Sequence, residues 1–156
     1  MKILVVYYSR DGHTRAVAQE IARKLGAEIE EIVDRKNRRG FFNWFLAGRD
    51  AAQKRLTEIG PLSCHPGSFD LVIIGTPVWA WNMTPAVRTY LTQQGDRIQQ
   101  AAFFCTQGGS GGAQALASMA ELWGRAPRAR LELNARELAG QEKPGKIDDF
   151  VSQLRT

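Results

Sequence analysis

Three short segments concentrate side chains and glycines that could hold a small anionic or aromatic ligand. The first, Ser9-Arg10-Asp11-Gly12-His13-Thr14, joins an apolar run to an amphipathic run. Gly12 permits a tight turn, and successive backbone N–H groups at a helix N-terminus form an anion site. Ser9 and Thr14 can add hydroxyl donors. Taken alone, this segment also fits a plain turn that starts a helix, because such turns are common.

The second segment, Thr76-Pro77-Val78-Trp79-Ala80-Trp81, places two tryptophans in a predicted loop. Large apolar rings usually find a core. A flat aromatic ligand would supply one, with stacking worth on the order of 1 kcal/mol beyond area burial. We expect one of the two tryptophans to pack under the helix that follows instead.

The third segment, Thr106-Gln107-Gly108-Gly109-Ser110, continues into Gly111-Gly112. A backbone so rich in glycine can lie flat against a ligand and offer N–H donors. The alternative is a flexible connector, but the segment follows an apolar run typical of a central strand. Its position therefore favours a binding role.

The elements that must position these segments alternate between strands and amphipathic helices, which predicts one α/β domain over residues 1–156. We expect helices from Thr14, from about Phe41 to Arg55, and after Thr84, an N-cap followed by Pro85. Two later helices show the apolar stripes Ala113, Leu116, Ala120, Trp123 and Ile147, Phe150, Val151, Leu154. The expected strands are Ile3 to Tyr8, Ile29 to Val33, Leu71 to Ile74, Ala101 to Cys105 and about Ala129 to Leu133.

The charge pattern of the strands indicates their order. The first, third and fourth are continuous apolar runs, as strands buried on both faces are, whereas the second and fifth contain charges that suit sheet edges. This fits a three-layer, doubly wound, five-stranded parallel sheet of order 2-1-3-4-5. In such a sheet a ligand binds beyond the carboxyl ends of the strands, where the order reverses. The three segments should therefore meet there.

Together the segments resemble the flavodoxin family, which places an S/T-x-T-G-x-T loop around the phosphate of FMN and two later loops beside the isoalloxazine ring. The resemblance covers nearly the whole chain in strand count, loop position and order. It implies a flavodoxin-like fold and non-covalently bound FMN. By position, the implied FMN-binding residues are Ser9, Arg10, Asp11, Gly12, His13 and Thr14; Thr76, Pro77, Val78, Trp79, Ala80 and Trp81; and Thr106, Gln107, Gly108, Gly109 and Ser110.

The chain departs from that family at two places. Asp11 stands where the family usually has threonine, and a carboxylate cannot donate a hydrogen bond to a phosphate. We expect its side chain to point outward and to pair with Arg10; Arg-Asp-Gly-x-Thr also occurs in related flavin-dependent protoporphyrinogen dehydrogenases. The third segment lacks the family's aspartate and tyrosine, which implies a more open flavin. Without the long-chain insertion, the chain resembles a short-chain member.

The resemblance implies low-potential electron transfer through FMN. The alternative is an FMN-dependent NAD(P)H:quinone or flavin oxidoreductase. A third class, a binding module that has lost FMN, is disfavoured by the aromatic and glycine-rich segments. The expected partner is a redox protein or a small-molecule acceptor such as a quinone.

Composition narrows the class further. With 44% hydrophobic and 24% charged residues the sequence is typical of a globular domain, and it contains no apolar stretch of membrane-spanning length. Cys64 and Cys105 lack metal-like spacing and indicate free thiols. We expect a cytoplasmic monomer or homodimer, and the formal charge of +5 is interpreted as a solubilising surface rather than a nucleic-acid site.

One segment, Arg35 to Leu46, combines basic and aromatic residues. We expect Phe41, Phe45 and Ala52 to form the buried face of a helix, with solvated arginines before it at positions 35, 38 and 39. The alternative is that the segment forms a rim of the flavin site or a docking surface for a partner.

Overall fold

The computed structural model describes residues 1–38 and 40–156, and for Phe41 only the backbone. Five parallel strands form the sheet in the order β2-β1-β3-β5-β6. This is the predicted order 2-1-3-4-5, because β4 is a short strand outside that path that pairs antiparallel with β3. The strands are β1 (Ile3–Tyr7), β2 (Glu28–Glu31), β3 (Leu71–Trp79), β4 (Asn82–Met83), β5 (Ala101–Gln107) and β6 (Arg130–Asn134).

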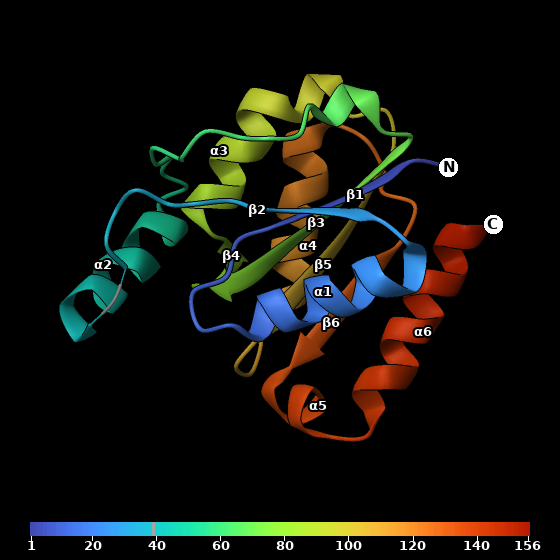
Figure 1. Ribbon diagram of the computed structural model, residues 1–156. Helices are drawn as coiled ribbons and strands as arrows, with labels where there is room; N and C mark the ends of the chain where they lie inside the picture. Colours follow the sequence, from blue (N-terminus) through green and yellow to red (C-terminus); the bar gives the residue numbers. More distant parts are fainter. Residues whose placement is uncertain (39) are drawn as a thin grey trace.

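Helices cover both faces of the sheet, which makes three layers (Figure 1). The first and last helices, α1 (His13–Leu25) and α6 (Glu142–Arg155), pack on one face. The other face is covered by α3 (Pro85–Gln94) and α4 (Gly112–Trp123). Two further helices, α2 (Phe41–Ala52) and the short α5 (Ala135–Ala139), lie near the carboxyl ends of the strands. Two short 3₁₀ helices lie at Pro66–Ser68 and Gly95–Arg97.

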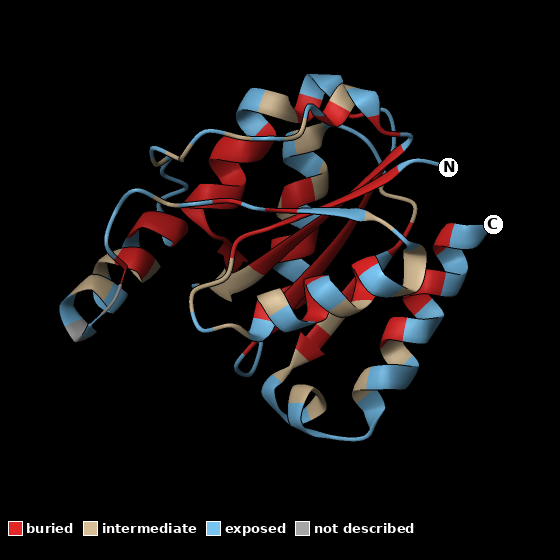
Figure 2. Cartoon of the chain, in the orientation of Figure 1, coloured by how far each residue is buried: buried red, intermediate tan, exposed pale blue. Residues whose placement is uncertain are grey.

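Several predicted local features are confirmed. Thr84 caps α3, accepting a hydrogen bond from the Val87 N–H at 3.4 Å, and Pro85 follows it. All four predicted apolar residues of α6 are buried. Figure 2 shows the sheet as the most buried layer, as its apolar central strands require. In α4 the predicted stripe is wrong at Ala113, which is exposed, while Ala115 and Met119 are buried.

The largest difference from the prediction concerns β3, which continues five residues beyond the expected end at Ile74 to Trp79. Thr76 and Pro77 pair with Cys105 and Thr106 of β5. The sequence misleads here because glycine and proline ordinarily end strands. Gly75 is needed in this strand because a Cβ there would lie 2.0 Å from the Phe104 ring. Most of the second predicted loop is therefore strand.

The other strand boundaries shift less. β5 ends at Gln107 rather than Cys105, and β2 covers Glu28–Glu31 rather than residues 29–33. The edge positions of β2 and β6 are confirmed. The strand order reverses between β1 and β3. The first segment follows β1, and the second segment forms the carboxyl end of β3 and the turn after it.

Candidate functional site

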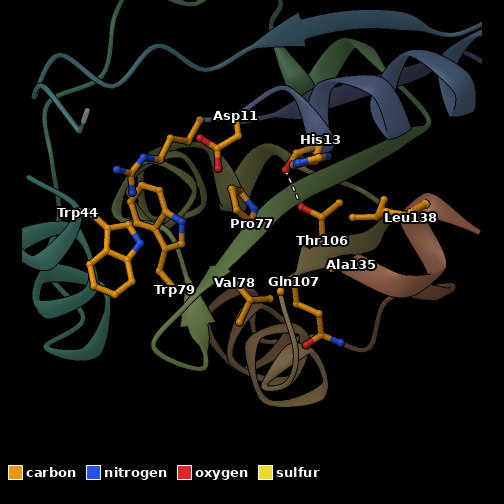
Figure 3. A pocket seen from close by; sticks show the side chains of 14 residues that line it. Asp11, His13, Trp44, Pro77, Val78, Trp79, Thr106, Gln107, Ala135 and Leu138 are labelled. Atoms are coloured by element: carbon orange, nitrogen blue, oxygen red, sulfur yellow. Dashed lines mark hydrogen bonds between the residues drawn. The ribbon is translucent and has the colours of Figure 1, made fainter. Parts of the chain in front are cut away.

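A cavity of about 460 Å³ opens at the carboxyl ends of β1, β3 and β5 (Figure 3). Its volume is within the range of small-molecule pockets, roughly 300–1,000 Å³. Ten residues named from the sequence line it, and they come from all three segments. They are Arg10, Asp11, His13, Thr14, Pro77, Val78, Trp79, Thr106, Gln107 and Gly108.

The first segment leads into the N-terminus of α1 at one end of this cavity. Gly12 has a φ of 94° and is the N-cap of α1, and no side chain caps the helix. Ser9 orders the turn, because its Oγ accepts a hydrogen bond from the Gly12 N–H at 3.0 Å. The hydroxyl oxygens of Thr14 and Thr106 lie 2.8 Å apart and join the first segment to the third. The uncapped helix start is electropositive and suited to a phosphate.

The charged residues of the first segment lie at the cavity rim. Asp11 and His13 are exposed and Arg10 is half-buried. Among the described residues Arg10 forms no ion pair, so the expected pairing with Asp11 is not seen; its guanidinium lies 5.7 Å from the centre of the Trp79 ring. The Asp11 side chain extends from the loop above Pro77 (Figure 3).

Two neighbouring side chains, Tyr8 and Arg38, lie against the Trp79 ring. Tyr8 contacts its ring edge-on at 5.7 Å between centroids, and the buried guanidinium of Arg38 lies 6.0 Å from it. Burial raises the pKa of Tyr8 to about 12, so its hydroxyl stays neutral. Thr76 fixes the base of the β3–β4 hairpin, accepting from the Thr84 N–H at 3.1 Å and donating to the Pro77 carbonyl at 2.8 Å.

The hairpin turn is formed by Ala80 and Trp81, whose φ values are 49° and 60°. A two-residue turn with both residues left-handed is the one that suits a hairpin, but it normally contains glycine or asparagine. Each such residue costs roughly 1–2 kcal/mol. Strain of this kind is concentrated at functional sites.

Trp81 lies across the third segment instead of under a helix. It is 60% exposed, and its Nε1 donates to the Ser110 Oγ at 3.4 Å. A Cβ at Gly111 would be 2.3 Å from the Trp81 ring. Trp79 is half-buried and packs against the apolar cluster that includes Ala86 and Val87 of α3. The expected packing of one tryptophan under α3 thus applies in part to Trp79 and not to Trp81.

The third segment is anchored through Gln107. Its Oε1 accepts from the Gly112 N–H at 2.6 Å and its Nε2 donates to Glu132 at 3.0 Å. The segment is therefore tied to β6 and to the start of α4, and is not simply a flexible connector.

The remaining residues named from the sequence lie around the cavity rather than in its lining. Ser9 and Gly12 shape the first turn, and Thr76 supports the hairpin. Ala80 lines an adjoining groove. Trp81, Gly109 and Ser110 line a recess on the other side of the third segment.

Trp44 lines the cavity, which agrees with the alternative interpretation that the segment Arg35 to Leu46 borders the site. Four lining residues lie outside the three segments: Trp44, Ala135, Leu138 and Ala139. The last three belong to α5, which begins with a capping box in which Asn134 and Glu137 bond reciprocally. That spacing is visible in the sequence and marks a helix start after the last strand. In Figure 3, Leu138 and Ala135 face Trp79 and Trp44 from the opposite side of the cavity.

The basic and aromatic segment, Arg35 to Leu46, also differs from its prediction. Phe45 and Ala52 are exposed, and α2 packs instead through Ala47 and Ala51. Four aromatic residues fall within positions 41–45 and point to different sides of an ideal helix, so periodicity does not determine which side is buried. Arg38 is buried rather than solvated. The predictions for Arg39 and for the Phe41 side chain fall outside the described residues.

Other candidate chemistry is accounted for. Cys105 is fully buried and burial raises the pKa of its thiol to about 12, so it is a small core residue. Within residues 1–38 and 40–156, no three His, Cys, Asp or Glu side chains could jointly hold a metal ion. No helix of the described chain has the length and apolar character needed to cross a bilayer.

Solved structures of similar fold span nearly the whole chain. A Lactobacillus acidophilus flavoprotein in complex with FMN is 21% identical, with a TM-score of 0.77 over 96% of this chain and 97% of its own. A protein from Bacteroides uniformis is 20% identical, with a TM-score of 0.79 over 97% of each chain. A Streptococcus pneumoniae flavodoxin is 12% identical, with a TM-score of 0.63 over 99% and 98%.

The sequence profile of the flavodoxin family matches residues 2–132. The matched range includes all three segments and every strand as far as Glu132, within β6. Family membership therefore agrees with the strand order and with the position of the cavity. This chain belongs to the flavodoxin family.

Proposed function

We propose that this chain binds FMN in the cavity and serves as an electron-transfer protein. The observation that supports this most directly is the joining, in one cavity, of an uncapped helix N-terminus and an aromatic wall. FMN has a phosphate at one end and a flat ring system at the other, so its two ends match these two environments. The L. acidophilus structure of similar fold contains FMN.

The residues present suit the parts of FMN. The backbone N–H groups at the start of α1 and the Thr14 hydroxyl would hold the phosphate. Trp79 and Val78 offer apolar surface to the ring, and Gly108 lets the third segment approach it closely. When bound, FMN would supply one- and two-electron redox chemistry, and the protein would orient the ring and limit its contact with water.

The FMN proposal is tested by comparing FMN with riboflavin, which lacks the phosphate. Calorimetric titration of wild-type protein should give clearly tighter binding of FMN. Thr14→Ala should weaken FMN binding roughly 10- to 100-fold, the value of one hydrogen bond to a charged group, and leave riboflavin binding unchanged. Thr92→Ala is the matched control, because Thr92 is exposed on α3 and its hydroxyl donates to the Arg88 carbonyl of its own helix.

Two results would contradict the FMN proposal or the role given to the first segment. A purified protein that is colourless and stays colourless with added FMN would contradict the proposal and favour a binding module. Equal affinities for FMN and riboflavin would show that the first segment does not hold the phosphate.

A second candidate function is an FMN-dependent NAD(P)H:quinone or flavin oxidoreductase. It is favoured by a groove beside α2 that adjoins the cavity and would admit a small molecule next to the ring. Steady-state oxidation of NADH and NADPH, with and without a quinone, separates the two functions. Rapid turnover would identify the oxidoreductase. A carrier would oxidise neither nucleotide at a significant rate but, once chemically reduced, would pass electrons to a one-electron protein acceptor.

A further inference from the structure

The second cavity that adjoins the proposed FMN site lies between α2 and the β3–β4 hairpin. Its volume is about 560 Å³, and it is lined by Arg10, Trp44, Phe45, Gly48, Arg49, Ala52, Val78, Trp79 and Ala80. We call it the α2 groove. It shares Arg10, Trp44, Val78 and Trp79 with the first cavity, so the two cavities adjoin.

The two sides of α2 differ in their surroundings. One side is fixed to the body of the protein by Ala47, Ala51 and the buried carboxylate of Asp50. The opposite side, with Trp44, Phe45 and Gly48, faces the α2 groove. Trp44 and Phe45 are 58% and 61% exposed. Large exposed apolar patches on a folded protein mark binding surfaces.

The charged residues of the described chain that line the α2 groove are basic. Arg10 and Arg49 line it, and no carboxylate belongs to its lining among the described residues. Arg10 has no ion-pair partner within the described chain, and Arg49 is only weakly engaged, 3.3 Å from Asp50. Aromatic walls with guanidinium groups suit a planar ring that bears a negative charge, through stacking and charge-assisted hydrogen bonds.

We propose that the α2 groove is a binding site for a planar aromatic anion of two or three fused rings. The groove is concave and of ligand size, and glycine and alanines at positions 48, 52 and 80 keep it open. Because Trp44 and Trp79 line both cavities, this ligand binds beside the occupant of the first cavity. This site is additional to the FMN site, and it deepens the second candidate function by naming the chemical class of ligand that the α2 groove takes.

Gly48 makes the proposal testable without harming the fold. A Cβ at this position would meet no atom within 4 Å, and Gly48 lies inside α2 without a positive φ. Replacement of a helical glycine favours the helix by up to about 1 kcal/mol. Gly48→Leu should therefore fill the α2 groove while α2 stays folded. Gly48→Ala is the control for helix propensity.

The experiment is calorimetric titration of FMN-saturated protein with anthraquinone-2-sulfonate, a planar anion, and with its neutral sulfonamide. Wild type should bind one sulfonate saturably and the sulfonamide several-fold more weakly. Gly48→Leu should weaken sulfonate binding at least tenfold and Gly48→Ala by less than threefold. Arg49→Gln should weaken the sulfonate and leave the sulfonamide unchanged.

A matched pair on the same helix distinguishes a small ligand from a macromolecule. Phe42 is 72% exposed but does not line the α2 groove, whereas Phe45 does. Phe45→Ala should weaken sulfonate binding and Phe42→Ala should not. Equal losses would overturn the proposal in favour of a general contact surface for another protein. Unchanged binding in Gly48→Leu, or no saturable binding by wild type, would overturn it directly.

Failure here and failure of FMN binding are separable. Each preparation is titrated with FMN first, and its flavin spectrum is recorded. If FMN does not bind, the sulfonate is titrated into the protein alone, and Gly48→Leu still reports whether the α2 groove holds it.

Discussion

The guanidinium of Arg38 donates from Nη1 to Oδ2 of Asp50 at 2.7 Å, and the two side chains are only 3% and 4% exposed. Arg38 also donates from Nε to Asp34 at 3.0 Å. This buried network fixes α2 against the segment that follows β2. Arg38 in turn lies over Trp79, so the network links the position of α2 to the cavity wall.

Loss of the Asp50 charge should destabilise the protein. Asp50→Asn leaves the buried Arg38 with one carboxylate partner fewer, and we expect a loss of roughly 1.5–3 kcal/mol in the free energy of unfolding. Urea denaturation at pH 7 measures it. The control is Glu58→Gln, whose exposed ion pair with Arg35 should contribute less than about 1 kcal/mol. Equal effects of the two substitutions would contradict a special role for the buried pair.

Ionised Asp50 should also make the free energy of unfolding fall at acid pH. Burial by itself would raise the pKa of Asp50, but hydrogen bonds from Lys36 and Arg38 outweigh it and lower the pKa from 3.8 to about 2. Because the folded-state pKa is the lower one, the stabilisation is present above pH 4 and is lost as the pH falls toward 2. It amounts to about 2 kcal/mol. The difference in unfolding free energy between wild type and Asp50→Asn should shrink over that range, and a constant difference would refute this assignment.

The contact between Trp81 and Gly111 should be sensitive to one added methyl group. Gly111→Ala places a Cβ against the Trp81 ring and at a φ of 94°, so we expect a loss of about 1–2 kcal/mol from backbone strain alone. Gly109→Ala is the matched control in the same segment, because its Cβ meets nothing within 4 Å. Denaturation curves of both variants provide the comparison, and similar losses would show that the Trp81 contact is unimportant.

Tyr90 has a buried hydroxyl for which the described structure offers no hydrogen-bond partner. Burial raises the pKa of this hydroxyl, so it stays neutral. Since an unsatisfied buried polar group costs roughly 1–3 kcal/mol, Tyr90→Phe should leave the stability unchanged or increase it. Thermal and urea unfolding measure this. A loss above about 1 kcal/mol would mean that a bound water or another partner satisfies the hydroxyl.

Asp11 should be a spectator of FMN binding. It is exposed at the cavity rim, where solvent screens its charge, and a carboxylate has no proton to donate to a phosphate. Asp11→Thr and Asp11→Asn should therefore bind FMN within about threefold of wild type, with any change toward tighter binding. Fluorescence titration of FMN gives the dissociation constants. A tenfold loss in either variant would show that this carboxylate takes part.

The sequence by itself determined the strand order, the amphipathic helices α1 and α6, the N-cap of α3 and ten residues of the cavity lining. These features depend on local periodicity, on capping residues and on the rule that ligands bind where the strand order reverses. The helices and the N-cap are encoded within a few neighbouring residues, and the strand order follows from comparing the charge patterns of the five strands.

Only the tertiary structure decided the features that depend on distant partners. β3 passes through Gly75 and Pro77 because β5 pairs with it and the Phe104 ring fills the space beside Gly75. Arg38 is buried because Asp34 and Asp50 meet it from either side. α2 therefore turns Ala47 and Ala51 inward and leaves Phe42, Trp44 and Phe45 exposed, since burying Asp50 against those charges fixes which side packs.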